Sequence, residues 1–176
     1  GGGGKIVIVG GEGRERDGDG GNGGVVEIRG GTAQGRASTD IAGNVMISGG
    51  IASASNGGSI VFLSGISADR SSGSAQFSTA NSGVSGVSGK IQIKSGKSTA
   101  GTSGDLRFSS GAATNGHGGS IQLLVGDGDT HAGGNVHLTA GRTLAKSKAG
   151  GNVQLTGGQG ASADTNDGGD GGKIIL

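Results

Sequence analysis

Apolar residues along this chain recur in pairs, with one residue between the two members and glycine close on both sides. The pairs are Ile6/Ile8, Val26/Ile28, Val45/Ile47, Ile60/Phe62, Ala75/Phe77, Ile91/Ile93, Leu106/Phe108, Ile121/Leu123, Val136/Leu138, Val153/Leu155 and Ile174/Leu176. Side chains of a strand point alternately to its two faces, so this spacing predicts eleven short strands, each with one apolar face. Successive pairs follow one another at a short and nearly constant interval. Such a repeat indicates a unit that must stack on its neighbours.

When the repeats are aligned on their apolar pairs, four further positions keep a constant residue type. A small residue usually stands two positions after the pair and a glycine follows it, as at Ser64-Gly65 and Ser110-Gly111. Two positions later the residue is small again, and a second glycine corner precedes the next pair. Glycine suits corners because it accepts positive φ and close backbone approach. The columns predict a large-residue strand and a small-residue strand in each repeat, joined by glycine corners.

We therefore predict an all-β fold: a parallel β-solenoid (β-helix) of about eleven coils, with roughly 15 residues per coil, glycine corners and no helices. A coil of two repeats, roughly 30 residues long, is the alternative. The shorter coil places Lys90 beside Asp105 and Asp127 beside Arg142, one strand spacing apart. Residues 1–176 form a single array, which we expect to be a segment of a longer repetitive protein because neither end differs from the middle.

Composition excludes several classes of protein. The chain has 46 Gly among 176 residues, but no strict three-residue period, which excludes a collagen triple helix. Glycine-rich chains are often disordered, and the regular apolar pairs argue against that alternative. A net charge of +1 and only three aromatic residues do not suit a nucleic-acid partner. No apolar run reaches the length that spans a bilayer, so we expect no membrane insertion.

The sequence offers weak candidates for chemistry. Aspartates in the glycine-rich stretches resemble those of calcium-binding β-rolls, but their spacing never repeats in tandem. These weak Ca²⁺ candidates are Asp17, Asp19, Asp127, Asp129, Asp164, Asp167 and Asp170. No helical pattern follows any glycine cluster, as a phosphate-binding loop requires. The histidines (His117, His131 and His137) occupy different columns, and no nucleophile–base set is evident. We expect no enzymatic activity and no cofactor.

Binding of ice or glycans on one flat face is the alternative function. Thr139 and Thr156 align in adjacent repeats, as in the threonine arrays of ice-binding solenoids. The same column holds Lys94, Ser109 and Leu124 in other repeats, so a regular face is missing.

The repeats at 118–126, 133–141 and 150–158 share the order Gly-Gly-x-apolar-x-apolar-x-x-Gly. This pattern resembles the Gly/Ser-rich tandem repeats of very large secreted microalgal proteins. The resemblance implies a structural role in extracellular fibres, adhesive strands or cell coverings, and viral fibre proteins have similar repeats. We accordingly expect a non-enzymatic, extracellular or cell-surface segment of a filament or adhesive fibre. Its expected partners are further copies of itself, with glycans as a second kind of partner.

Overall fold

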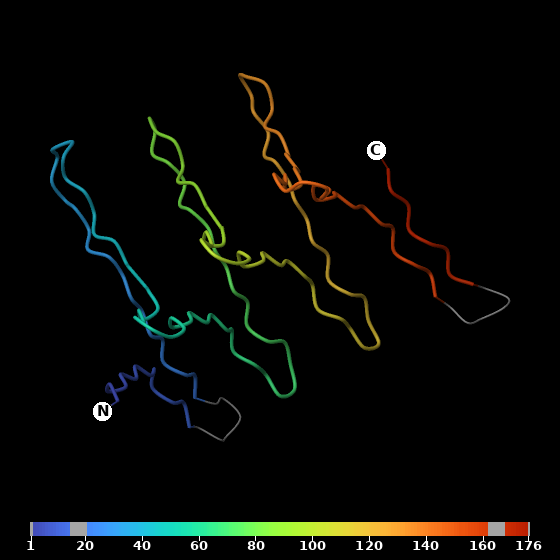
Figure 1. Cartoon of the computed structure of the whole chain (residues 1–176). Coiled ribbons are helices and arrows are strands. Elements are labelled where there is room, and N and C mark those ends of the chain that lie inside the picture. Colours follow the sequence, from blue (N-terminus) through green and yellow to red (C-terminus); the bar gives the residue numbers. More distant parts are fainter. Residues whose placement is uncertain (1, 15–20, 162–167, 176) are drawn as a thin grey trace. The chain divides into compact units, whose positions relative to one another are not determined.

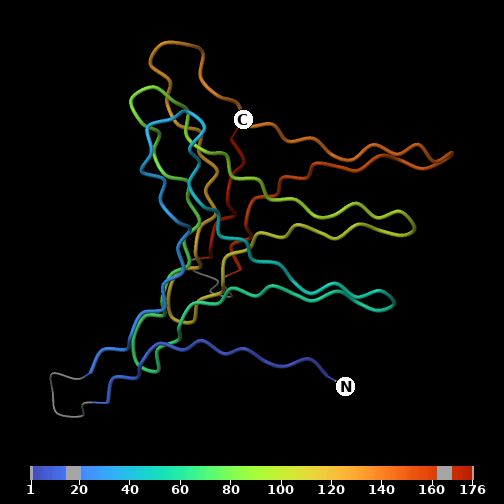
Figure 2. The ribbon, with the colours of Figure 1, turned by 90° about the vertical axis from the view of Figure 1, so that its left-hand side faces the viewer.

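The computed structural model describes residues 2–14, 21–161 and 168–175, and within these ranges it contains no helix and no strand. The ribbon runs extended between narrow loops, in which the chain travels out and back (Figures 1 and 2). The prediction of an all-β solenoid is therefore wrong for the described residues, whichever coil length is considered. The absence of helices there agrees with the sequence pattern, because glycine and alternating apolar residues both disfavour helix.

The chain divides into two units, Gly1–Ile91 and Gln92–Leu176. Each unit by itself is built from the same two parts, a loop and the extended stretch that leads to the next loop.

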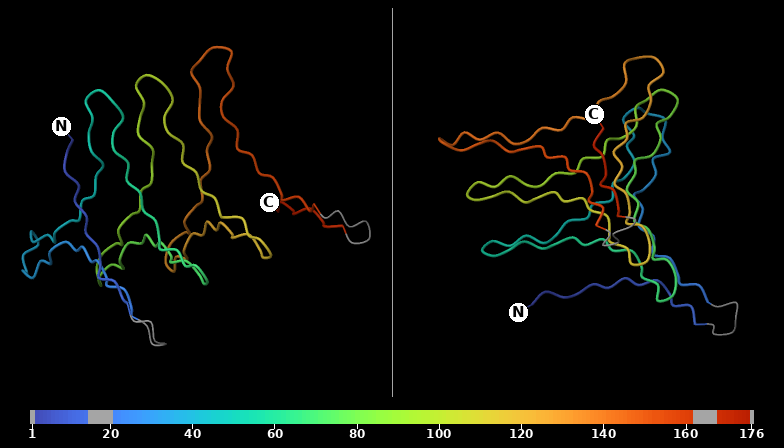
Figure 3. Two further views of the ribbon diagram at one scale, coloured as in Figure 1. Left: turned by 90° about the horizontal axis from the view of Figure 1, so that it is seen from below. Right: turned by 90° about the vertical axis from the view of Figure 1, so that its right-hand side faces the viewer.

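Each loop is closed at its base by two residues that lie side by side, which we call the neck. The ten loops, bounded by their neck residues, are 10–24, 30–43, 49–58, 64–73, 79–89, 95–104, 110–119, 125–134, 140–151 and 157–172. At six necks the closing glycine donates its N–H to the carbonyl of the glycine at the loop entrance, for example Gly58 to Gly50 at 2.9 Å. Figure 3 shows such loops from two further directions.

The neck explains why two sequence columns are small. The first neck residue is Gly, Ser, Thr, Val or Ala, and the second is Gly in all ten loops. A Cβ on Gly119 would lie 3.2 Å from the Cβ of Ser110, and one on Gly43 would lie 2.9 Å from the backbone nitrogen of Gly31. The small residue after one apolar pair and the glycine before the next pair thus lie side by side, and glycine is needed for this close approach.

The chain between necks has a constant length, and we call these stretches the bridging segments. Each holds seven residues, with apolar residues at the third and fifth positions: 24–30, 43–49, 58–64, 73–79, 89–95, 104–110, 119–125, 134–140 and 151–157. All variation in repeat length therefore falls in the loops. Loops tolerate extra residues at low entropic cost, which explains why they absorb the variation.

The loop tips are turned by local hydrogen bonds, and this corrects the prediction of a second short strand. The Asp40 N–H donates to the Ala37 carbonyl at 3.0 Å, and the Arg70 N–H donates to Ser67 Oγ at 3.0 Å. Asn115 has a φ of 58°, in the left-handed region that asparagine tolerates. Ser67, a member of the small-residue column, thus accepts a hydrogen bond within a turn, and no described residue of that column lies in a strand.

Apolar side chains keep the predicted alternation but are not buried. No described residue is buried, so the prediction that the apolar pairs point into an intramolecular core is wrong for the described residues. Within the bridging segment 58–64, exposure nevertheless alternates along the chain: Ile60 46%, Val61 80%, Phe62 63% and Leu63 89%. The paired positions share the more sheltered face, as a two-residue period requires.

The predicted ion pair between Asp127 and Arg142 of neighbouring repeats is likewise not formed. Among the described residues, ion pairs join Arg14 to Glu12 and Arg29 to Glu27, two positions apart within one stretch. Asp127–Arg142, which lies within one unit, is not among them, whereas Lys90 and Asp105 belong to different units. Because the Asp127–Arg142 pair required stacked coils, its absence from the described part of the chain agrees with the loss of the solenoid.

The neck geometry gives a first testable prediction. Gly43→Ala places a Cβ 2.9 Å from the Gly31 nitrogen and is expected to break the 2.8 Å hydrogen bond from the Gly43 N–H to the Gly31 carbonyl. Amide hydrogen exchange at residue 43 should accelerate several-fold, equivalent to about 1 kcal/mol. Gly31→Ala is the matched control, because a Cβ at Gly31 meets nothing within 4 Å. Equal exchange in the two variants would contradict the closed neck.

Candidate functional site

The aspartates predicted as weak Ca²⁺ candidates do not gather in the described part of the chain. Asp127 and Asp129 lie in loop 125–134, where the Thr130 hydroxyl donates to Asp129 at 2.9 Å, and Asp170 lies in loop 157–172. No group of three acidic or histidine side chains suited to a metal ion occurs among the described residues. The remaining candidates, Asp17, Asp19, Asp164 and Asp167, lie outside those residues. The described residues thus give no support for a calcium site.

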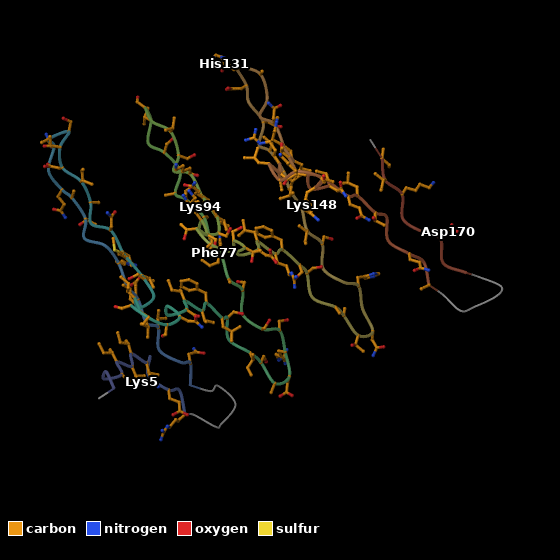
Figure 4. All side chains as sticks on the ribbon, in the orientation of Figure 1. Lys5, Phe77, Lys94, His131, Lys148 and Asp170 are labelled. Carbon is orange, nitrogen blue, oxygen red and sulfur yellow. The ribbon has the colours of Figure 1, made fainter. Side chains whose placement is uncertain are left out.

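The three histidines are distributed over separate elements. His117 lies in loop 110–119 and His137 lies in bridging segment 134–140. Figure 4 places His131 at the tip of loop 125–134. The different sequence columns of these residues therefore correspond to different parts of the repeat.

The bridging segments carry the most distinctive surface of the molecule, a series of apolar faces on which no described residue is buried. Each face consists of the two paired residues, flanked by the neck residues. Across the neck of loop 64–73, two such faces touch: the rings of Phe62 and Phe77 lie 6.0 Å apart, edge to face at 78°. An aromatic pair of this geometry contributes about 0.5–1.5 kcal/mol, so the neck brings together the apolar faces of two successive segments.

Backbone groups along the bridging segments are also exposed. In the described residues the backbone–backbone hydrogen bonds number seven, of which six close necks and one turns loop 30–43. A folded chain normally forms about one hydrogen bond per residue. Between their neck residues, the described seven-residue segments therefore form no backbone hydrogen bonds. An uncovered strand edge is a template for pairing with another strand.

The accessible surface area measures how far the chain is from a self-contained fold. It is 17917 Å² for a mass of 16.5 kDa. A folded monomer of this mass exposes about 7,600 Å², and its unfolded chain about 24,000 Å². The chain thus exposes about 10,000 Å² more than a compact monomer would. This excess is several times the roughly 1,600 Å² of a standard protein–protein interface.

The second face of the bridging segments carries both polar and apolar side chains. It is formed by the residues between the paired positions and beside them, and Figure 4 shows side chains projecting from the ribbon along its described length. Polar residues predominate there, as at Gln92 and Gln122. Some segments carry exposed apolar residues on this face too, including Met46, Val61 and Leu124. Both faces of these segments therefore offer contact area.

The sequence prediction missed the neck, although a signal for it is present. Alignment of the repeats on the apolar pair separates the small residue after one pair from the glycine before the next pair. In loop 64–73 these two residues are Ser64 and Gly73, and they form the closed base. Comparing the first residue of each loop with its last residue would have found the two small columns that meet.

Comparison of the chain with protein-family models, with curated proteins and with solved structures found no match. The described residues also contain no helix with the length and hydropathy needed to cross a membrane.

Proposed function

We propose that this chain is a structural, non-enzymatic segment of an extracellular filament or adhesive fibre, and that it self-associates. The observation that carries this proposal is the exposed surface of 17917 Å², on which the apolar faces of the bridging segments are not buried and their backbone groups form no hydrogen bonds between the necks. A chain of this kind gains stability by burying those faces against another molecule, because ordering a glycine-rich backbone costs about 1–2 kcal/mol per residue.

The repetitive design also supports a structural role. Nine bridging segments of equal length present nearly equivalent faces, whereas a catalytic site requires a unique arrangement of different groups. The extracellular placement rests on the compositional resemblance to secreted fibre repeats. Neither argument needs a cofactor or a small-molecule ligand.

The proposal is tested by assembly of the purified chain. Sedimentation velocity over a wide concentration range should show a shift from monomer to large species, and negative-stain images of the pelleted material should show filaments. The test variant is Gly58→Ala, which places a Cβ 2.8 Å from the Gly50 nitrogen. Its matched control is Gly50→Ala, whose Cβ meets nothing within 4 Å. We expect Gly58→Ala to raise the concentration at which filaments form, by about fivefold for the loss of about 1 kcal/mol.

Two results would contradict the proposal. A chain that stays monomeric at millimolar concentration does not self-associate. Particles of irregular shape, equally affected by Gly50→Ala and Gly58→Ala, would indicate unspecific aggregation rather than a built filament.

A further inference from the structure

We propose that the partner of each bridging segment is a bridging segment of a second copy of this chain, paired through the backbone, and that the copies join in more than one register. This inference rests on the proposed self-association and specifies its partner and geometry. It predicts overlapping, staggered copies, and hence a filament longer than one chain.

The partner must satisfy backbone groups as well as cover apolar side chains. The described bridging segments make backbone hydrogen bonds at their necks and not along their length. An extended segment of another copy supplies both requirements at once, because its N–H and C=O groups match an open edge and its alternating side chains match the exposed face. A globular partner with no free edge of its own would cover the side chains and leave the backbone unpaired.

The constant length of the segments allows several registers. Each bridging segment has seven residues with apolar side chains at the third and fifth positions, so any segment can lie against any other with its apolar face on the same side. A slip of one residue would turn every side chain to the wrong face, whereas a slip of one whole segment preserves the pattern.

Because the necks are closed, repeats of unequal length can still pair in a staggered array. The repeat that begins at Val153 is longer than the one that begins at Leu106, and such differences would prevent a staggered array if the extra residues separated the segments. The necks hold the ends of successive segments together in loops of different length. The Gly24 nitrogen lies 2.7 Å from the Gly11 carbonyl oxygen in loop 10–24, and the Gly58 nitrogen lies 2.9 Å from the Gly50 carbonyl oxygen in loop 49–58. Loops of different length therefore lie outside the paired region.

The surface available is sufficient for a partner on both edges. The chain exposes about 10,000 Å² beyond a compact monomer of its mass. A stable interface buries about 800 Å² on each partner, so more than one copy can be accommodated.

Disulfide cross-linking tests the inference, and no native disulfide can form because the chain contains no cysteine. Gln92, Gln122 and Gln154 are the central residues of segments 89–95, 119–125 and 151–157. A central residue faces the central residue of its partner whether the two segments run parallel or antiparallel. Opposed residues of paired strands have Cα atoms about 4.5–5.5 Å apart, within the range that a disulfide spans.

The experiment mixes the variants Gln92→Cys, Gln122→Cys and Gln154→Cys in pairs before assembly and oxidises them mildly afterwards. We expect all three mixed dimers, as well as each homodimer, to form at least tenfold faster than dimers of the loop-tip control His131→Cys. Mass spectrometry of the tryptic disulfide-linked peptides identifies the residues joined.

The outcomes separate the inference from the proposed function. If the chain does not assemble at all, the proposed function fails. If filaments form but segment cysteines cross-link no faster than the loop-tip cysteine, the pairing surface is wrong. If the filaments give only one set of cysteine partners, the copies join in a single register, and the staggered arrangement is wrong.

Discussion

Replacement of both Ile121 and Leu123 by aspartate is expected to abolish filament formation at concentrations where the natural chain assembles. These residues form the apolar face of bridging segment 119–125 and are exposed in the isolated chain. Burial of two such side chains at an interface contributes about 3–6 kcal/mol. Its loss corresponds to a rise of about 10²–10⁴ in the assembly concentration. Sedimentation of the variant across that range measures the effect.

The control for this change is Ile51→Asp combined with Leu144→Asp. Both residues are apolar and exposed, but they lie in loops 49–58 and 140–151 rather than on a bridging segment. The control introduces the same two charges, so net charge cannot account for a difference between the variants. If the control prevents assembly as strongly as the segment variant does, the apolar faces of the bridging segments are not the interface.

Acidification provides a second check on the segment variant. The introduced carboxyl groups carry charge above about pH 4 in the free chain. Burial in the filament disfavours the charged form, so the protonated variant should assemble better. We expect the assembly of the segment variant to recover partly as the pH falls through about 4, relative to the natural chain measured at the same pH.

Replacement of Gln122 by proline is expected to block assembly while leaving the apolar face intact. Proline removes the N–H of the central residue of segment 119–125 and restricts its φ to a narrow range. A partner carbonyl left without a donor costs about 1–3 kcal/mol, in addition to the lost hydrogen bond, so the assembly concentration should rise about tenfold or more. The rise should be visible in the same sedimentation series.

Two substitutions control for side effects of this change. Gln122→Ala removes the same side-chain amide and keeps the backbone N–H, and it should assemble almost as the natural chain does. Ser38→Pro places proline at the second position of the turn that the Asp40 N–H to Ala37 carbonyl bond closes, where proline is favoured. If Gln122→Pro assembles like Gln122→Ala, the backbone edges do not take part in pairing.

The sequence by itself determined the local design of this protein. The two-residue spacing of pairs such as Ile60/Phe62 predicted short strands with one apolar face. The described residues form no strand, but side-chain exposure does alternate along segment 58–64. This pattern follows from the alternation of side chains along an extended chain, which acts within a few residues.

The tertiary structure alone decided what each glycine corner does. Ser64-Gly65 and Gly73 suit either a corner of a stacked coil or the closed base of a loop, because glycine permits close approach in both. In the structure the Gly73 N–H donates to the Gly65 carbonyl at 2.9 Å, and the loop closes on itself. Alternation fixes which face of a segment is apolar, but it carries no information on which strand lies beside that face or edge. For that reason the spacing suggested an intramolecular stack, whereas in the structure the apolar faces of the described bridging segments are not buried and their backbone groups are not paired between the necks.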